Sequence, residues 1–318
     1  MPNPVIDVLI PTYNPNPEHL VEALKSLQGQ TLWDWTALVH DDCSKTDTEG
    51  IVTPYLFDER IRFVRSDKRL GIGGNWNASA ASTSSPLVAY LFQDDIWAPN
   101  YLTEAVKILD ANPTVGCVSM EHTYAIEENM PTVDNYQAIR ELYDAQAMSG
   151  QHSGKEILTM WLDRELVPNI IGEPSFVVMR RNIMNQAGPF LTDMSQLLDV
   201  EYWTRILAIS DWYCLRGNFG TFRVHEKGAS AVHQEAGKGL FDRLRCFGLL
   251  IERLPEQEKL IAIAAREKAL KSMVTKFRSR VTSGKSVSAH GSGELRKFCL
   301  RHPLLILKAI IQSYRSGK

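Results

Sequence analysis

The sequence predicts an α/β protein with a mainly parallel sheet flanked by helices, followed by a helical region at the C-terminus. Short apolar runs alternate with stretches whose apolar residues recur every three to four positions, as in strands joined by helical crossovers. Two of the apolar runs end at paired acids, at 41–42 and 94–95. Beyond Gly239 only helical periodicity remains. We therefore expect an α/β body over residues 1–238 and a helical region over residues 239–318.

The first 120 residues alternate regularly between strands and helices. Residues 5–10 are apolar except for Asp7, and a turn at 11–15 ends this first strand. Apolar residues at helical spacing over 20–27 then predict a helix that stops at Gly29. The further expected elements are strands 35–39, 60–64, 87–92 and 115–120, and helices 51–57, 76–82 and 102–109.

The later residues are less regular. Residues 121–151 are polar, acidic and aromatic without a clear period, so we expect loops with a helix near 137–143. A Ser/Gly/His-rich break at 283–293 interrupts the C-terminal helices. The other expected elements are strands 175–179, 212–215 and 221–224, and helices 156–162, 199–209, 240–254, 257–281 and 294 to about 314.

The composition narrows the class of protein. With 318 residues, of which 44% are hydrophobic, the chain can bury a large core. Its five cysteines are scattered and form no Cys-x-x-Cys pair, which favours neither a disulfide framework nor a zinc site and suits a reducing cytosol. We recognise no signal peptide and no apolar stretch of about 18 residues, and we expect a cytoplasmic protein.

The charge is unevenly distributed. The net charge is −2, yet residues 266–318 contain 13 Lys or Arg and only 2 Asp or Glu. The C-terminal region is therefore basic and the body is acidic. An acidic body makes nucleic acid a poor partner.

The acids at the end of the run 87–92 are the first candidate site. Ligands of open α/β sheets bind at the C-terminal edge of the strands, which is where Asp94 and Asp95 are expected. Adjacent carboxylates repel each other and no cation lies nearby in the sequence, so a divalent metal ion is the economical explanation. An ordinary acidic turn is the alternative.

Two more acidic sites accompany this pair. Asp41 and Asp42 end another strand, on the same rim if the sheet is parallel, and Asp199 and Glu201 open a later helix. Such a rim suits a ligand that carries both hydrogen-bond donors and metal-bridged phosphates.

The glycine-rich stretch 71–75 could itself hold a phosphate. A dinucleotide-binding loop, however, needs a third glycine where this chain has Trp76, and it follows the first strand of its fold. A Walker loop would need a Lys-Ser/Thr pair that is missing here. A nicotinamide-dependent enzyme is therefore disfavoured.

Six segments of the chain form an ordered set of motifs. They are Val8 to Asn14, His40 to Ser44, Gly71 to Asn77, Phe92 to Pro99, Asp199 to Arg205 and Phe222 to His225. In this order they resemble the signature of the family 2 glycosyltransferases with the nucleotide-diphospho-sugar (GT-A) fold. The resemblance spans roughly residues 5–230. Any one segment is a weak signal, and six in order are a strong one.

The resemblance implies a donor site in residues 1–120 and an acceptor site in residues 121–238. Thr12 and Asp42 match positions that bind the nucleotide base and ribose, and Asn14 lies near the diphosphate. The full set of residues implied to contact the nucleotide-diphospho-sugar, which we expect to be a UDP- or dTDP-sugar, is Pro11, Thr12, Tyr13, Asn14, Asp42, Gly71, Asn75 and Asp94.

The resemblance also implies a bound Mn²⁺ or Mg²⁺. Asp94 and Asp95 match the metal and diphosphate site, and His225 matches a late residue that helps to close it. Many relatives have a further Asp where this chain has Phe92, so metal binding here rests on fewer carboxylates. A histidine at a strand end is also often structural.

Asp199 matches the catalytic base of the family, and a carboxylate in the first turn of a helix can alternatively act as a cap. Glu173 and Ser175 resemble the acceptor-side loop, and we expect Glu201 and Trp203 to contact the acceptor as well. Asn75 could cap a helix instead of touching phosphate. Trp97, Trp161 and Trp203 could stack on sugars, although such residues more often belong to the core.

The function implied is an inverting, metal-dependent transfer of a sugar to a saccharide or lipid-linked acceptor in surface polysaccharide or lipopolysaccharide synthesis. A nucleotide-sugar-binding protein without turnover is the alternative. The basic, apolar segment 294–318 suits a helix on the anionic inner face of the cell membrane. A helix that packs on the catalytic domain or on a second subunit of a homodimer fits equally well.

Overall fold

The computed structural model describes residues 4–128, 133–145, 148–194, 196–226, 228, 242–284, 296 and 299–315. None of the helices in these ranges combines the length and the apolar character that crossing a bilayer requires. All five cysteines are free. The expected boundary at residues 238 and 239 lies outside the described residues.

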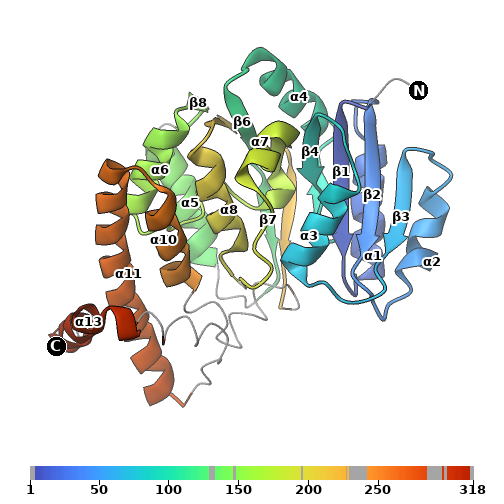
Figure 1. The fold of residues 1–318 in the computed structure, drawn as a ribbon. Helices are drawn as coiled ribbons and strands as arrows, with labels where there is room; N and C mark the ends of the chain where they lie inside the picture. Colours follow the sequence, from blue (N-terminus) through green and yellow to red (C-terminus); the bar gives the residue numbers. More distant parts are fainter. Residues whose placement is uncertain are drawn as a thin grey trace.

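The body is built on one eight-stranded, mostly parallel sheet, as predicted (Figure 1). Its strand order is β3-β2-β1-β4-β9-β6-β10-β8, and only β9 and β8 run against the other strands. The bounds are β1 Ile6–Thr12, β2 Trp35–Asp41, β3 Ile61–Arg65, β4 Leu87–Tyr90, β6 Val115–Met120, β8 Gly150–His152, β9 Val177–Arg180 and β10 Asp211–Leu215.

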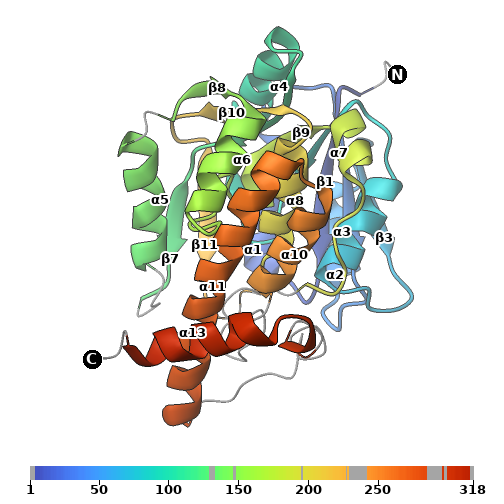
Figure 2. The ribbon, with the colours of Figure 1, turned by 60° about the vertical axis from the view of Figure 1, so that its left-hand side comes forward.

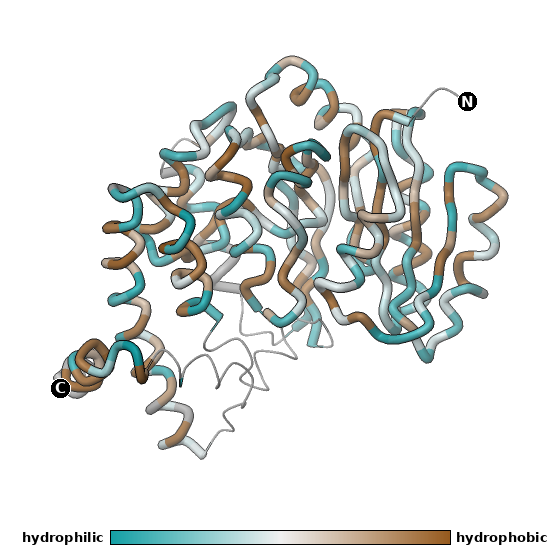
Figure 3. Tube along the Cα trace, in the orientation of Figure 1, coloured by the Kyte–Doolittle hydropathy of each residue, from teal (hydrophilic) through white to brown (hydrophobic). Residues whose placement is uncertain are grey.

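The register of the central strands sets the position of the site. All seven residues of β1 are buried, as expected for a strand covered on both faces. Thr12 at the end of β1 is paired with Asp41 at the end of β2, and β4 runs parallel to β1 on its other side. The predicted donor-site residues therefore follow strands that end at the same edge. Figure 3 shows the apolar character of these strands.

A second sheet brings a distant segment to this edge. It contains β5 Ile96–Trp97, β11 Gly220–Val224 and β7 Thr123–Ile126, in that order. β5 follows Asp95 and pairs with β11, which ends immediately before His225. The pairing therefore places His225 near the acids that follow β4.

Helices cover the sheet on both faces, and all of those expected in the body are present (Figure 1). Two short 3₁₀ helices, Thr53–Tyr55 and Pro174–Phe176, accompany them. The α-helices of the body are α1 Pro17–Gln28, α2 Thr48–Val52, α3 Ile72–Ala81, α4 Tyr101–Ala111, α5 Val133–Ala145, α6 Gly154–Asp163, α7 Arg181–Ala187 and α8 Leu198–Leu207.

Helix α3 begins at Ile72 and not at the expected Trp76, so the glycine-rich stretch is its first turn and not a loop. Position 73 requires a glycine, because a Cβ atom there would lie 2.5 Å from the carbonyl oxygen of Leu191. Gly71 precedes the helix with φ of 78°, a conformation that favours glycine. The glycines thus serve close packing and a turn.

The C-terminal region contains α10 Asp242–Arg253, α11 Glu256–Thr282 and α13 Pro303–Arg315. Helix α10 and the first half of α11 share the main hydrophobic core of the body through residues such as Phe247 and Ala262. Helix α13 instead crosses the C-terminal half of α11 (Figure 2), where Ala309 packs near Leu270 and Met273. Helix α10 and the first half of α11 therefore belong to the body, whereas α13 packs with the second half of α11 in a separate small cluster.

Candidate active site

The acids that follow β2 are both buried, and each has protein partners. Asp41 accepts hydrogen bonds from the Ser44 backbone N–H (2.9 Å) and the Thr48 hydroxyl (2.9 Å) and is fully enclosed. Asp42 accepts from the backbone N–H groups of Leu70 (2.5 Å) and Gly71 (3.0 Å). Asp41 thus stabilises the loop that follows β2, whereas Asp42 fixes the segment that leads into α3.

The segment after β1 offers a more open surface. Pro11 and Thr12 are buried, but Tyr13 is half-buried and Asn14 is exposed. The Arg69 guanidinium lies 4.0 Å from the centre of the Tyr13 ring, a cation–π arrangement for which the sequence carries no local signal. The Tyr13 N–H donates to the Gln93 side chain (2.8 Å), which ties this segment to the residues before Asp94.

Asn75 is not a helix cap, because it is the fourth residue of α3 and Gly71 occupies the N-cap position. Its side chain is buried and is hydrogen-bonded to His40 Nδ1 (2.5 Å) and to the Thr12 carbonyl (3.3 Å). Both polar groups of the amide are therefore used to join α3 to β1 and β2. Asn75 positions Thr12, and direct contact with the donor stays a prediction.

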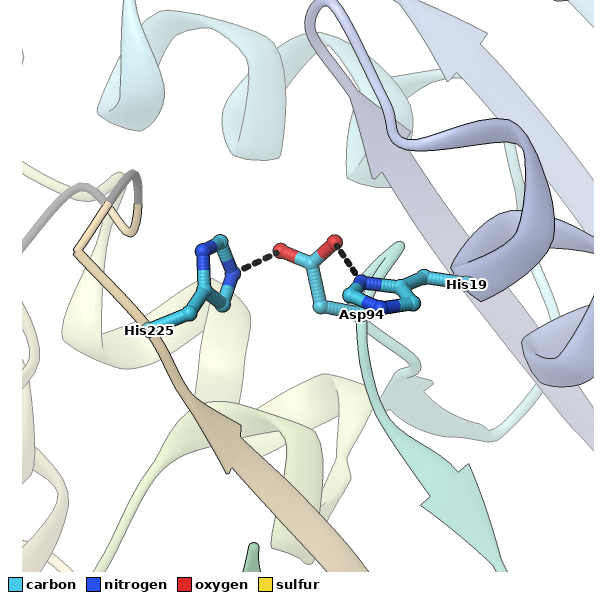
Figure 4. Close-up of side chains that lie close together, drawn as sticks. All are labelled: His19, Asp94 and His225. Atoms are coloured by element: carbon cyan, nitrogen blue, oxygen red, sulfur yellow. Dashed lines mark hydrogen bonds and ion pairs between the residues drawn. The ribbon is translucent and has the colours of Figure 1, made fainter. Parts of the chain in front are cut away.

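Three side chains from separate elements meet beside Asp94 (Figure 4). His225 Nε2 lies 3.3 Å from Asp94 Oδ2, and His19 Nδ1 lies 3.5 Å from Asp94 Oδ1. The possible ligand atoms of the three residues all lie within 4.8 Å of one another. The hydrogen bond with Asp94 raises the pKa of His225. A carboxylate flanked by two imidazoles is a donor set that fits a divalent transition metal ion.

Asp95 is not a member of this group. It is 1% exposed, and its Oδ1 accepts a hydrogen bond from the Arg223 backbone N–H (3.1 Å). Burial raises the pKa of Asp95 well above its usual range. Of the two adjacent acids, Asp94 faces the histidines, whereas Asp95 anchors β11 to the main sheet.

Asp199 lies in the first turn of α8, and Leu197 occupies the N-cap position. The carboxylate accepts from the Val200 N–H (2.8 Å) and from the Asn169 side-chain amide (2.8 Å). Burial of the carboxyl group raises the pKa of Asp199 to about 7, and the negative charge of Glu173 adds to the increase. Such a group exchanges protons near neutral pH, as a general base must.

Glu173 is the predicted acceptor-side residue that reaches this region. Its Oε2 lies 3.2 Å from His122 Nε2, and the His122 ring stacks on Phe176. A pocket opens beside this pair, lined among others by His122, Tyr124 and Gly172. His122 follows β6 in sequence, and we did not identify it as a candidate from the sequence.

Ser175 and the three tryptophans do not face an open site. Ser175 is 0% exposed, and its Oγ accepts the Phe92 N–H (3.1 Å). Trp97, Trp161 and Trp203 are all buried, which corrects the expectation that Trp203 contacts an acceptor. The Trp203 indole N–H instead donates to the Gly172 carbonyl (2.9 Å) and so supports the Glu173 segment from within the core.

Glu201 also points away from the predicted acceptor site. It is 1% exposed and pairs with Arg205 Nη2 (2.8 Å) on its own helix and with Arg253 Nη1 (3.1 Å) on α10. Since Glu201 follows Asp199 by two positions, the two side chains lie on different sides of α8. Glu201 therefore joins α8 to the C-terminal region.

The donor-side and base-side residues form one connected group. Gln93 joins the segment before Asp94 to Tyr13, and the Ser175 hydroxyl accepts the Phe92 N–H. Asn169, in the same segment as Ser175, donates to the Gly172 carbonyl and to Asp199. Hydrogen bonds therefore connect the two sides.

The mostly parallel sheet flanked by helices, with the candidate residues at the carboxyl ends of its strands, is the arrangement of the GT-A fold. The model of the family described as "Glycosyl transferase family 2" matches residues 7–169. The chain belongs to glycosyl transferase family 2.

Two relatives illustrate the sequence similarity. The *Escherichia coli* enzyme UDP-Glc:α-D-GlcNAc-diphosphoundecaprenol β-1,3-glucosyltransferase WfgD is 28% identical over 51% of this chain. The uncharacterised protein MT1568 of *Mycobacterium tuberculosis* is 26% identical over 64% of this chain. The chain spans 62% of the length of each of these relatives.

Two solved structures show the same fold. *Staphylococcus aureus* TarS 1–349, in complex with UDP-GlcNAc, superposes with a TM-score of 0.62 over 97% of this chain and 80% of its own, at 15% identity. The mannosyltransferase PcManGT of *Pyrobaculum calidifontis*, in complex with GDP-Man and Mn²⁺, gives 0.59 over 99% and 88%, at 18% identity.

Proposed function

We propose that the protein is an inverting glycosyltransferase that moves a sugar from a nucleotide-diphospho-sugar to an acceptor hydroxyl. The observation that carries this proposal is the hydrogen bonding of segment 169–175, which contacts Asp199 through the Asn169 amide and contacts Phe92, two positions before Asp94, through the Ser175 hydroxyl. Glycosyl transfer needs these two regions together, one for the leaving diphosphate and one for the incoming hydroxyl.

The donor side is formed by the segments after β1 and β2. Thr12 and Asp42 bind the base and ribose, with Asp42 retaining acceptor capacity beyond its two backbone hydrogen bonds. Tyr13, stacked with Arg69, offers an aromatic face to the nucleotide, and Asn14 lies toward the diphosphate. Pro11, Gly71 and Asn75 hold these residues in place.

Asp94 and His225 hold a divalent ion, Mn²⁺ or Mg²⁺. When bound, the ion neutralises the charge that develops on the leaving diphosphate. Both residues are aimed at a common point by the pairing of β5 with β11. Asp95 supports this arrangement through the Arg223 backbone.

Asp199 acts as the general base. Its carboxylate removes the proton of the attacking hydroxyl, while Asn169 fixes the orientation of the carboxylate through its amide. Attack from the face opposite the diphosphate inverts the configuration of the anomeric carbon.

The acceptor is a saccharide or a lipid-linked saccharide of surface-polysaccharide synthesis. The name of the *E. coli* relative, which acts on a diphosphoundecaprenol-linked sugar, supports this class of acceptor. The Glu173–His122 pair borders the acceptor site and offers hydrogen-bonding groups beside Gly172, which Asn169 joins to Asp199. The donor is a UDP- or dTDP-sugar, and the names of WfgD and of the TarS complex favour UDP.

The last helix gives the enzyme a peripheral contact with the cytoplasmic face of the membrane. On α13 the side chains of Leu304, Leu307 and Ile311 are 79%, 54% and 46% exposed. Arg301 and Lys308 lie exposed on the same segment. Exposed apolar residues mixed with cations suit an anionic membrane surface, where a lipid-linked acceptor would be found. A homodimer contact through this face is the alternative.

A donor screen with the purified protein tests the proposed function. We expect a UDP-sugar with Mn²⁺ to raise the melting temperature, since a ligand at 100 times its Kd adds about 2.7 kcal/mol of stability. We also expect acceptor-dependent UDP release that Asp199→Asn reduces by about 10²–10⁴-fold. If the protein binds a donor but transfers its sugar to none of the acceptors tested, the alternative of an inactive nucleotide-sugar-binding protein is favoured.

A further inference from the structure

His19 lies opposite His225 across the Asp94 carboxylate, although no motif of the sequence singled it out. It is the third residue of α1, and its side chain is 24% exposed. Its Nδ1 atom is buried and, among the residues that the structure describes, has no hydrogen-bond partner. The nearest charged atom is Asp94 Oδ1, at 3.5 Å. A buried nitrogen without a hydrogen bond, directed at a carboxylate, calls for a ligand.

The spacing of the three side chains suits a single ion. With bonds of about 2.1 Å, ligand atoms around one transition metal ion lie about 3.0–3.5 Å apart. His225 Nε2 lies 3.3 Å from Asp94 Oδ2 and His19 Nδ1 lies 3.5 Å from Asp94 Oδ1, so each imidazole meets one oxygen of the carboxylate. One ligand atom from each of the three residues lies within 4.8 Å of the other two. The two rings are inclined at 68°, with centroids 5.9 Å apart, and they approach Asp94 from different elements (Figure 4).

Arg223 holds the same three segments together. Its side chain donates to the backbone carbonyl of Asp94 (2.7 Å) and pairs with Glu22 of α1. Glu22 lies one helical turn after His19, and Arg223 precedes His225 by two positions in the sequence, so each is close to the histidine of its own segment. This clamp fixes the relative positions of the three side chains.

We propose that His19 is a third protein ligand of the metal ion, and that the resulting site of two imidazoles and one carboxylate selects Mn²⁺ or a similar transition metal ion over Mg²⁺. Imidazole nitrogen is a good ligand for transition metal ions and a poor one for Mg²⁺, which prefers oxygen. The inference deepens the proposed metal-dependent transfer and rests on the assignment of Asp94 and His225 to the metal.

Direct metal binding tests the inference without relying on turnover. Mn²⁺ affinity of the full-length protein is measured by electron paramagnetic resonance in the presence of UDP, with Mg²⁺ as the competitor. We expect His19→Ala and His19→Gln to weaken Mn²⁺ binding at least tenfold and to narrow the preference for Mn²⁺ over Mg²⁺. Glu18→Gln, the exposed neighbour in the same turn of α1, is the matched control and should retain both values.

The absorption spectrum of bound Co²⁺ provides a second measurement, because its visible bands respond to the loss of a nitrogen ligand. Melting temperatures without metal establish that the variants fold, and only the increase caused by Mn²⁺ should be lost in the His19 variants. Unchanged Mn²⁺ affinity, selectivity and Co²⁺ spectrum in folded His19→Ala would overturn the inference and leave His19 as a neighbour of Asp94.

The outcome is separable from that of the proposed function. Sugar transfer that needs Mn²⁺, combined with unaltered metal binding in His19→Ala, would reject the third ligand and retain the enzyme. Metal binding that depends on His19, in a protein that transfers no sugar, would retain the third ligand and reject the proposed transfer.

Discussion

At the scale of single residues, the raised pKa of Asp199 predicts how the proposed transfer responds to pH. A carboxyl group with a pKa of about 7 is mostly protonated at pH 6, and only its ionised form can act as a base. We therefore expect kcat/KM, measured with saturating Mn²⁺, to rise between pH 6 and 8 and then to level off. A profile that is flat over this range would contradict the assignment of Asp199 as the base.

Substitutions of two residues that affect the pKa of Asp199 should move the pH profile of kcat/KM in opposite directions. Asn169→Ala removes a hydrogen bond to the carboxylate, so the pKa of Asp199 should rise and the activity should require higher pH. Glu173→Gln removes a negative charge that raises the pKa, so the profile should shift to lower pH. The pH of half-maximal kcat/KM in each variant is the measurement, and it distinguishes an electrostatic effect from a change in acceptor KM.

The same pKa shift predicts a gain of stability when the Asp199 carboxyl group is removed. Because the folded protein binds the Asp199 proton more tightly than the unfolded chain does, ionisation of this group opposes folding as the pH rises from about 4 to 7. Asp199→Asn should therefore melt at a higher temperature than the wild type at pH 8, and the difference should narrow as the pH falls toward 4. Equal melting temperatures at pH 8 would show that the carboxylate is ionised without penalty.

At the scale of secondary-structure elements, Glu201 shows why a motif can mislead. The sequence places it two residues after Asp199, and its position predicted contact with the acceptor. It instead connects α8 to α10 through Arg253. Glu201→Gln should lower the free energy of unfolding by about 3 kcal/mol, the usual effect of breaking a buried ion pair, and should leave the acceptor KM unchanged.

Urea unfolding of Glu201→Gln, compared with Glu252→Gln, measures this effect. Glu252 is an exposed residue next to Arg253, and its substitution should leave the free energy of unfolding unchanged. A variant that keeps its stability but loses acceptor affinity would restore Glu201 to the acceptor site.

The order of the elements could be predicted from the sequence because local periodicity encodes it. Every strand expected in the first 120 residues is present, and the acids at 41–42 and 94–95 do follow strands that end at one edge. Local patterns do not encode strand pairing, so the antiparallel insertion of β9 between β4 and β6 was not foreseen. The small sheet formed by β5, β11 and β7 was missed for the same reason.

The candidate site could be predicted only where its residues follow strand ends. His19 was missed because it lies on a helix, and the rotation of α1 that turns it toward Asp94 depends on tertiary packing. Trp203 and Ser175 were assigned to the acceptor because their types suit sugars, yet burial against neighbouring segments gives them structural roles. Arg223 could have been noticed, since it lies two positions before His225 within a segment already singled out.

At the scale of the whole molecule, the C-terminal region has two parts. One part packs in the core of the body, and the other has an exposed apolar side. The charge pattern predicted a basic appendage over residues 266–318, within a helical region that begins at residue 239. Helix α10 and the first half of α11, which form the start of that region, contribute to the main core. The apolar residues of α10 cannot reveal this from the sequence alone, because an amphipathic helix looks the same whether its partner is a sheet or a membrane. Helix α13 keeps an exposed apolar side and cations, so it is the part available for a membrane.

Vesicle co-sedimentation tests the role of α13. The wild type should bind vesicles that contain anionic lipid and not neutral ones, and the binding should weaken as salt rises, since each basic residue near the surface contributes about 1 kcal/mol. Leu304→Asp together with Leu307→Asp should reduce binding more than tenfold, because both exposed apolar contacts are lost. Leu260→Asp is the matched control, because Leu260 is 68% exposed on the first half of α11.

The oligomeric state of the same variants separates the membrane from a second subunit. Sedimentation velocity should give the same mass for the wild type and the double variant if α13 contacts lipid. If the double variant instead changes from dimer to monomer while vesicle binding is weak in both, the exposed side of α13 is a subunit interface. The membrane would then have to recruit the enzyme through its acceptor, and the salt dependence of binding would disappear because no basic helix would face the lipid.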